Sequence, residues 1–323
     1  MRLEIAVIEL TNDCNLRCKH CYGHFENNTI ISKYDFERII NQIYNLGCTQ
    51  IILSGGEPML LGNKLIDYVK IAKKKGFPFV ALTTNGTLNI TDQQELLKYL
   101  DMIQISIDGL KETHNNIRGK GTFQKALSFI KENSNDSCKI SLMMSVHKDN
   151  YNEVKEVHKL SKELNAEFAI EIVTPCGRGN SINILSKEEL KVLKDFIITE
   201  NINCNDPISF CENDNISLFN NTFKVGCSAG TSALCIDAHM NVFPCVRLRL
   251  NLGNLKEKTL DDIIKNKIIR DLDDRNLLKG NCGKCLNKFI CGGCRARAFA
   301  LTNDYLEGDE LCIDFKEITK SLI

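Results

Sequence analysis

The chain has 323 residues, of which 43% are hydrophobic, so it can bury one large domain, or a large and a small one. Its 41 Lys and Arg residues balance 41 Asp and Glu residues, which excludes the basic excess typical of nucleic-acid binders. No apolar run reaches the length of a membrane span, and the N-terminus has no signal-peptide pattern. We therefore expect a cytoplasmic protein with neither a nucleic-acid nor a membrane partner.

In the first half of the chain, short apolar segments alternate with longer amphipathic ones. Strands are predicted at 4–9, 50–53, 79–83, 102–107, 140–146 and 168–172. Helices are predicted between them at 33–46, 62–75, 92–100, 123–133 and 153–164. This repetition predicts a parallel sheet with right-handed crossovers. Six strand–helix units are fewer than a full barrel has, so we expect an α/β fold whose residues 1–180 form a partial (β/α)6 TIM-like barrel.

The pattern changes after residue 180. Residues 181–226 are predicted as a linker that contains a helix at 187–198 and an Asn-rich stretch. Residues 227–312 are predicted as a small cysteine-rich domain with a hairpin at 234–246 and a helix at 260–271, and residues 313–323 as a terminal helix. The small domain has little apolar periodicity, so bound metal clusters are expected to stabilise it.

The 16 cysteines indicate metal or redox chemistry, because a reducing compartment keeps thiols free. Cys14, Cys18 and Cys21 lie directly after the first predicted strand, at the end of a barrel strand where active sites occur. A [4Fe–4S] cubane usually takes four thiolates, so three leave one iron open to a small ligand. The alternative is a zinc site, with His20 or His24 as the fourth ligand.

With this C-x3-C-x2-C spacing the sequence resembles the radical S-adenosylmethionine (SAM) superfamily, whose motif is C-x3-C-x-aromatic-C. His20 stands in the aromatic position here. The resemblance implies that the open iron binds the methionine part of SAM, and that one electron from the cluster cleaves SAM to a 5′-deoxyadenosyl radical that abstracts a hydrogen atom. It also implies a reducing partner such as flavodoxin or ferredoxin. The protein itself orients the cofactor and excludes water and oxygen.

A second motif, Ser54-Gly55-Gly56-Glu57-Pro58, follows the second predicted strand. Glycines allow close backbone approach to a ligand, and a glutamate can pair with a cation. Alone, the motif is typical of a tight turn. Together with the cysteine triad, the resemblance implies that Gly55, Gly56, Glu57 and Pro58 bind the methionine ammonium of SAM.

Polar residues follow the third and fourth predicted strands. The resemblance implies that Asn85 lies at the SAM site, that Ser106 and Asp108 bind the ribose, and that Arg118 binds the SAM carboxylate. For each residue the alternative is ordinary capping of the helix that follows.

Near the C-terminus, the run Cys282-x2-Cys285-x5-Cys291-x2-Cys294 is followed by Arg-Ala-Arg-Ala and a last cysteine. It resembles the SPASM domain of peptide-modifying radical SAM enzymes, which implies two auxiliary [4Fe–4S] clusters. The first would be held by Cys227, Cys245 and Cys294, and the second by Cys282, Cys285, Cys291 and Cys312. A zinc ribbon is the alternative for the four-cysteine run.

Two departures from the SPASM pattern stand out. The first auxiliary cluster has three assigned ligands; Cys235 is the nearest candidate for a fourth and Cys211 another, and without either an iron would be open to a substrate thiol. The family usually has glycine where this chain has Met240, so we expect the neighbouring Asn241 to take the left-handed conformation.

The remaining cysteines are interpreted by their places along the predicted strands. Cys48 and Cys138 precede strands, so we expect them to be packed core residues far from the chemistry. Cys176 follows the sixth strand and faces the expected active site. It is a candidate hydrogen-atom donor to a substrate radical, and a packed cysteine is the alternative.

The motifs predict radical SAM chemistry but do not identify the substrate. Our first expectation is a maturase of ribosomally made peptides or of proteins, which forms a thioether or carbon–carbon crosslink or inverts a stereocentre. The alternatives are heme or quinone cofactor synthesis, sulfatase maturation, and a non-catalytic iron–sulfur or zinc-binding module. The first predicted strand begins at about Leu3, so a leader peptide is expected to bind a separate protein or the barrel itself.

Overall fold

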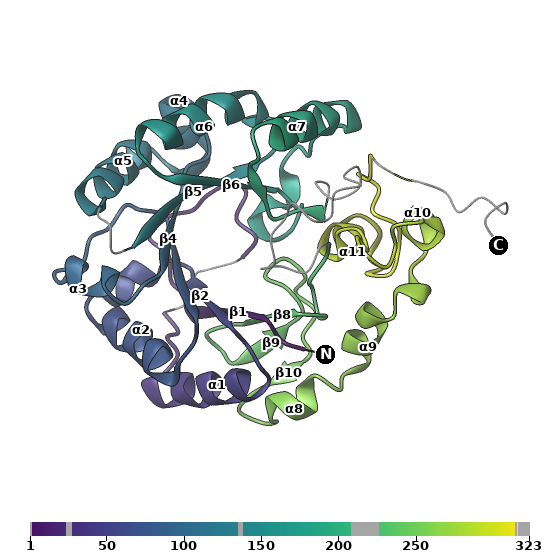
Figure 1. The fold of residues 1–323 in the computed structure, drawn as a ribbon, viewed down its shortest axis with the longest axis horizontal. Coiled ribbons are helices and arrows are strands. Elements are labelled where there is room, and N and C mark those ends of the chain that lie inside the picture. The colour runs from purple at the N-terminus through teal and green to yellow at the C-terminus, as the bar shows by residue number, and fades with distance from the viewer. Residues whose placement is uncertain (1, 24–27, 135–137, 208–225, 314, 316–323) are drawn as a thin grey trace.

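The computed structural model describes residues 2–23, 28–134, 138–207, 226–313 and 315. Six parallel strands form the barrel in chain order, as predicted (Figure 1). They are β1 (Ile5–Thr11), β2 (Gln50–Gly55), β3 (Phe79–Thr84), β4 (Met102–Ser106), β5 (Lys139–Val146) and β6 (Glu167–Ile172). The α/β fold with a partial TIM-like barrel is therefore confirmed.

Helices cover the outside of these strands (Figure 1). They are α1 (Lys33–Asn45), α2 (Lys64–Lys75), α3 (Gln93–Leu97), α4 (Lys111–Arg118), α5 (Thr122–Asn133) and α6 (Val154–Glu163), with short 3₁₀ turns η1 (Pro58–Leu61), η2 (Tyr151–Glu153) and η3 (Gly177–Ser181). Helix α4 was not predicted, because it buries only His114 and Ile117 and so has almost no apolar periodicity.

The two faces of the barrel strands differ in polarity. Side chains such as Ile8, Leu53 and Ile105 are fully buried in the main hydrophobic core. Because side chains alternate along a strand, the intervening positions face the barrel interior, and several of these are polar, including Glu9 and Glu171. The interior is therefore suited to a polar ligand.

The barrel continues beyond its six predicted strands. Helix α7 (Lys187–Thr199) begins with a capping box between Ser186 and Glu189, and β7 (Asn203–Cys204) pairs in parallel with β6. Residues 203–204 thus extend the sheet from within the segment 181–226, which the sequence pattern suggested was a linker. The strand was missed because it has only two residues. The domain boundaries themselves stay a prediction, and Cys211 lies outside the described residues.

The predicted C-terminal hairpin is confirmed as β8 (Ala233–Ile236) and β9 (Asn241–Phe243), with β10 (Gly253–Asn254) paired antiparallel to β9. Strand β8 also pairs in parallel with β1, where Cys235 is opposite Val7. The cysteine-rich region therefore continues the barrel sheet as one ten-stranded sheet and flanks its first strand (Figure 1).

The turn of this hairpin corrects one prediction. Met240, not Asn241, has the positive φ of 72°, while Asn241 is the first residue of β9. The Asp237 carboxylate accepts hydrogen bonds from the backbone N–H groups of His239 (2.9 Å) and Asn241 (2.8 Å), and the Met240 side chain is buried. These contacts hold the left-handed residue in place without glycine.

The predicted helix at 260–271 is wrong as a single element, because it is divided into α8 (Leu260–Ile263) and α9 (Lys267–Asp273). Asn266 has an extended backbone, and its side chain accepts a hydrogen bond from the Ile268 N–H, so it starts a new helix. The elements η5 (Arg275–Leu277), α10 (Gly280–Lys284) and α11 (Arg295–Thr302) follow. The predicted terminal helix falls almost wholly outside the described residues.

Within the described ranges, the search for a helix both long and apolar enough to cross a membrane finds none.

Candidate active site and cluster ligands

The loop that carries Cys14, Cys18 and Cys21 follows β1 and is packed tightly against the end of β2. The Gly56 N–H donates to the Thr11 carbonyl (2.8 Å) and the Glu57 N–H to the Asp13 carbonyl (2.8 Å). A Cβ atom at Gly56 would overlap the Asp13 carbonyl, and Gly55 has a positive φ of 136°. Both glycines are therefore needed for this close approach.

The end of β6 contacts the same loop from another side. The Gly179 N–H donates to the Cys21 carbonyl (3.1 Å), and a Cβ atom at Gly177 would overlap the Tyr22 carbonyl. The triad loop is thus fixed by glycine contacts at the carboxyl ends of two barrel strands, where barrel active sites lie.

The buried triad thiols ionise only where neighbouring groups stabilise the thiolates. Burial raises the pKa of Cys14 to about 12 and also raises that of Cys18. The Leu16 N–H donates to the Cys14 sulfur (3.4 Å), and the Arg118 guanidinium lies 3.9 Å from the Cys18 sulfur. Such donors stabilise thiolates bound to iron. The triad therefore fits an iron–sulfur cluster, which would hold these thiols deprotonated.

Within the described part of the chain, no three His, Cys, Asp or Glu side chains converge closely enough to hold one metal ion. In a cubane each thiolate binds a different iron, so its ligands need not converge on one point. His24, proposed above as an alternative zinc ligand, lies outside the described residues.

Glu57, which is predicted above to bind the methionine ammonium of SAM, is held in a fixed position in the structure. Its side chain is 1% exposed and accepts hydrogen bonds from the Met59 N–H (3.0 Å), the Thr84 hydroxyl (2.7 Å) and the Asn85 N–H (2.8 Å). Burial nevertheless raises its pKa. Arg118 acts on the Glu57 carboxylate electrostatically, but it forms its ion pair with Asp108 and not with Glu57. A fixed, buried carboxylate of this kind favours a cationic ligand.

Three other predicted SAM residues have protein partners. The Asn85 side chain donates to Asn15 of the triad loop (2.9 Å). Asp108 is fully buried, is ion-paired with Arg118, and accepts a hydrogen bond from the Ser145 N–H (3.0 Å). Burial alone would raise the pKa of Asp108, but Arg118 holds it well below its usual range. Asp108 and Arg118 thus position each other, and Asn85 and Arg118 contact the triad loop. The contacts of these three residues to SAM stay predictions.

Ser106 and His20 lie in the same region. Ser106 ends β4 and is nearly buried. Burial lowers the pKa of His20 to about 4, so the ring is neutral. Its Nε2 lies 3.4 Å from both the Arg118 guanidinium and the Asp108 carboxylate, and its Nδ1 is a buried atom with no described partner. His20 therefore lies beside the Asp108–Arg118 ion pair.

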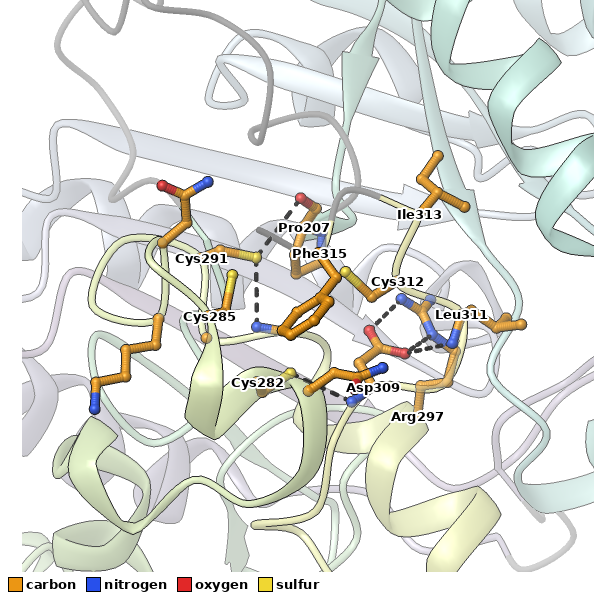
Figure 2. Close-up of a pocket in the computed structure, with 15 residues that line it drawn as sticks. Pro207, Cys282, Cys285, Cys291, Arg297, Asp309, Leu311, Cys312, Ile313 and Phe315 are labelled. Carbon is orange, nitrogen blue, oxygen red and sulfur yellow. Dashed lines mark hydrogen bonds and ion pairs between the residues drawn. The ribbon is translucent and has the colours of Figure 1, made fainter. Parts of the chain in front are cut away.

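The four cysteines assigned to the second auxiliary cluster line one pocket (Figure 2). They are Cys282, Cys285, Cys291 and Cys312. The Cys282 sulfur accepts from the Arg295 guanidinium and from the Asp309 N–H, both at 3.3 Å. A Cβ atom at Gly293 would lie 2.6 Å from that sulfur. A shared hollow with N–H donors aimed at a sulfur fits an iron–sulfur cluster.

A buried ion-pair network borders this pocket. Arg297 pairs with Asp206 (2.8 Å) and Asp309 (2.6 Å), and all three side chains are at most 3% exposed. Asp309 also accepts from the Cys294 N–H (2.9 Å). The network ties the segment after β7 to the cysteine-rich region.

The cysteines assigned to the first auxiliary cluster lie nearer the barrel. The Cys227 N–H donates to the Cys291 carbonyl (2.9 Å), and Cys227 is close enough to Cys294 to act on it electrostatically. The Cys245 sulfur accepts from the Arg247 N–H (3.5 Å). Cys235 is fully buried in β8 and interacts electrostatically with Cys245, so it stays a candidate for the fourth ligand.

The structure also reveals polar residues that the sequence analysis missed. Glu9 is buried between Arg249 (2.5 Å) and the Tyr22 hydroxyl (3.1 Å), and the Arg249 guanidinium lies over the Tyr22 ring. Arg247 donates to the Ile172 carbonyl at the end of β6 (3.0 Å). The available signal was the alternation of Cys245, Arg247 and Arg249 with apolar residues, which is typical of an extended segment with one cationic face.

Cys176 lies where predicted, after β6. Burial raises the pKa of its thiol to about 11, and it is near Arg247, Cys245 and Glu171. Its role as a hydrogen-atom donor stays a prediction. Cys48 and Cys138 are confirmed as buried members of the hydrophobic core.

Comparison with known proteins agrees with this geometry. The radical SAM superfamily model matches residues 8–161, and the SPASM iron–sulfur cluster-binding domain model matches residues 227–286. The AdoMet-dependent heme synthase of Methanosarcina barkeri is 31% identical over 94% of this chain and 95% of its own length. The chain therefore belongs to the radical SAM superfamily, in the group that carries a SPASM domain.

Two further similarities bear on function and on fold. The subtilosin biosynthesis protein AlbA of Bacillus subtilis is 27% identical over 90% of this chain and 66% of its own length. The crystal structure of SuiB from Streptococcus suis bound to S-adenosylmethionine superposes with a TM-score of 0.75 at 19% identity, covering 96% of this chain and 77% of SuiB. The second similarity supports the fold alone.

The chain is thus an enzyme whose cofactors are SAM and [4Fe–4S] clusters. Cys14, Cys18 and Cys21 would hold the cluster that, when bound, supplies the electron for the cleavage of SAM. The fixed Glu57 carboxylate and the packed loop would orient the cofactor.

Proposed function

We propose that this enzyme modifies a side chain of a carboxylate-bearing tetrapyrrole. The observation that carries the proposal is the match to the heme synthase of M. barkeri, which spans 94% of this chain and 95% of that protein. A relative that aligns over both full lengths supports a shared substrate class more strongly than one that aligns over part of its length. Tetrapyrrole chemistry therefore replaces peptide maturation as the first choice.

The barrel interior suits such a substrate. Arg249 and Arg247 reach the ends of β1 and β6 from the cysteine-rich region. Carboxylates that leave water need charge-assisted hydrogen bonds, which guanidinium groups provide. In this proposal the barrel holds SAM at the triad and Glu57, and the substrate lies between the triad and the first auxiliary cysteines.

Peptide or protein maturation is the second candidate. AlbA, named for subtilosin biosynthesis, supports it at 27% identity over 90% of this chain. This candidate predicts that a peptide, and not a porphyrin, increases SAM cleavage.

The test is an anaerobic assay of the reconstituted enzyme with SAM, dithionite and iron coproporphyrin III, a tetrapyrrole with several propionate groups. The expected result is a porphyrin-dependent rise in 5′-deoxyadenosine, matched by a change in porphyrin mass. A parallel reaction contains candidate peptides encoded beside the gene. A modified peptide together with an unchanged porphyrin would overturn the proposal in favour of the second candidate.

A further inference from the structure

Residues 245–249 of the cysteine-rich region contact two barrel strands, β1 and β6. Leu248 is fully buried in a small apolar cluster with Leu272 and Ala296. The alternate residues face the barrel, because Arg249 bonds to Glu9 of β1 and Arg247 to the Ile172 carbonyl of β6. This segment thus places one guanidinium group at β1 and another at the end of β6.

The two arginines differ in how their charge is balanced. Arg249 has an ion pair with Glu9 at 2.5 Å. Arg247 has one hydrogen bond to a neutral carbonyl, its Nε is buried without a hydrogen-bond partner, and no carboxylate in the described ranges forms an ion pair with it. A cation with a buried, unsatisfied N–H is costly unless an anion binds there.

The nearby protein carboxylates already have other partners. Cys294, Glu171, Cys245 and Asp206 act on Arg247 electrostatically, and the two cysteines are assigned above to the first auxiliary cluster. However, Glu171 accepts a hydrogen bond from the Ser145 hydroxyl (2.9 Å), and Asp206 is ion-paired with Arg297 (2.8 Å). Among the described carboxylates none is therefore free to pair with Arg247, and a substrate carboxylate fits it beside the cluster thiols.

A second unsatisfied donor lies at the same end of β6. Thr174 is 3% exposed, and its hydroxyl is buried without a described partner. It is two residues beyond Ile172, whose carbonyl binds Arg247. A guanidinium and a hydroxyl together can satisfy both oxygens of a carboxylate.

The geometry points to Arg247 and Thr174 as a binding subsite for a substrate carboxylate, such as a propionate group. The inference rests on the proposed function, which supplies the anionic substrate. Cys176 and Cys245 lie near Arg247, so a carboxylate bound here places the substrate beside the first auxiliary cysteines. Arg247 and Thr174 then determine how the substrate is oriented in the barrel.

The test measures binding of iron coproporphyrin III to the reconstituted holoenzyme with SAM and without reductant, by titration of porphyrin absorbance. Arg247→Gln is expected to weaken binding about 10- to 100-fold, as for loss of a hydrogen bond to a charged group. Arg247→Lys is expected to give an intermediate loss, and Thr174→Val a smaller one. The exposed Arg270→Gln is the matched control and is expected to bind like the wild type.

The porphyrin tetramethyl ester provides a second readout, because it lacks the carboxylate. Its affinity is expected to be equal for wild type and Arg247→Gln. Unchanged affinity for the free acid in both Arg247→Gln and Thr174→Val would overturn the subsite. Loss of iron from Arg247→Gln together with normal binding by Thr174→Val would also overturn it, because Arg247 would then serve the auxiliary cluster. Failure of the wild type to bind porphyrin would overturn the proposed function instead, and the subsite with it.

Discussion

Replacing Glu57 by Gln tests whether the buried carboxylate serves the cofactor or only the turn that it caps. Two of its three donors, the Met59 N–H and the Thr84 hydroxyl, bond to one oxygen, and the Asn85 N–H bonds to the other. A glutamine can keep the first two bonds with its amide oxygen. Its NH2 group then faces the Asn85 N–H, which loses its partner.

The magnitude follows from these contacts. One unsatisfied buried N–H costs about 1–3 kcal/mol of stability. Burial already raises the pKa of Glu57, so removing its charge offsets part of this cost, and we expect a loss near the lower end, about 1 kcal/mol. Binding of SAM loses an ion pair in a buried site, for which we expect a loss of about tenfold to a hundredfold in affinity.

The assay has two parts, urea unfolding of the protein without SAM and calorimetric titration of the reconstituted protein with SAM. The exposed Glu163→Gln is the matched control and is expected to change neither quantity. Unchanged SAM affinity in Glu57→Gln, whatever its stability, would show that Glu57 only caps η1 and would refute the assignment.

Three further predictions concern the triad, a buried histidine and the buried ion-pair network. The wild type is expected to hold about twelve irons if all three cubanes form; Cys18→Ala is expected to lose about four and to stop forming 5′-deoxyadenosine, and continued SAM cleavage would contradict the triad assignment. Burial lowers the pKa of His114 from 6.5 to about 4, so the folded state resists protonation and loses stability as the pH falls from 6.5 towards 4. Between pH 7 and pH 5, the free energy of unfolding is expected to fall by about 2 kcal/mol less in His114→Asn than in the wild type. An equal pH dependence of the two proteins in urea titrations would refute this cause. Arg297→Leu leaves two buried aspartates without their cation and is expected to cost about 3–5 kcal/mol, measured as a lower thermal midpoint; an unaltered midpoint would mean that the network is not stabilising.

The cluster triad and the Gly55–Gly56 turn could be predicted because each depends on residues close together in the sequence. The six barrel strands could be predicted for the same reason, since hydrophobic periodicity is local. By contrast, β1 and β8 pair across more than half the chain, and no local pattern specifies that contact.

Some details depend on single side chains whose effect only the tertiary structure reveals. Asn266 looks like an acceptable helix residue, but it caps a new helix and divides the predicted one. Met240 takes a left-handed conformation because the Asp237 carboxylate holds the turn. Arg247 is an ordinary basic residue in the sequence, and only the tertiary structure shows its unsatisfied N–H near the end of β6.

The pairing of β1 with β8 has a consequence for the life of the nascent chain. During synthesis, one edge of the first strand stays without a partner until residues 233–236 leave the ribosome. A free strand edge readily joins another chain and aggregates. The cysteine-rich region therefore also protects the edge of the barrel sheet. A version of this protein that ends at residue 207 would expose the edge of β1 and is expected to aggregate even with its three cluster cysteines intact.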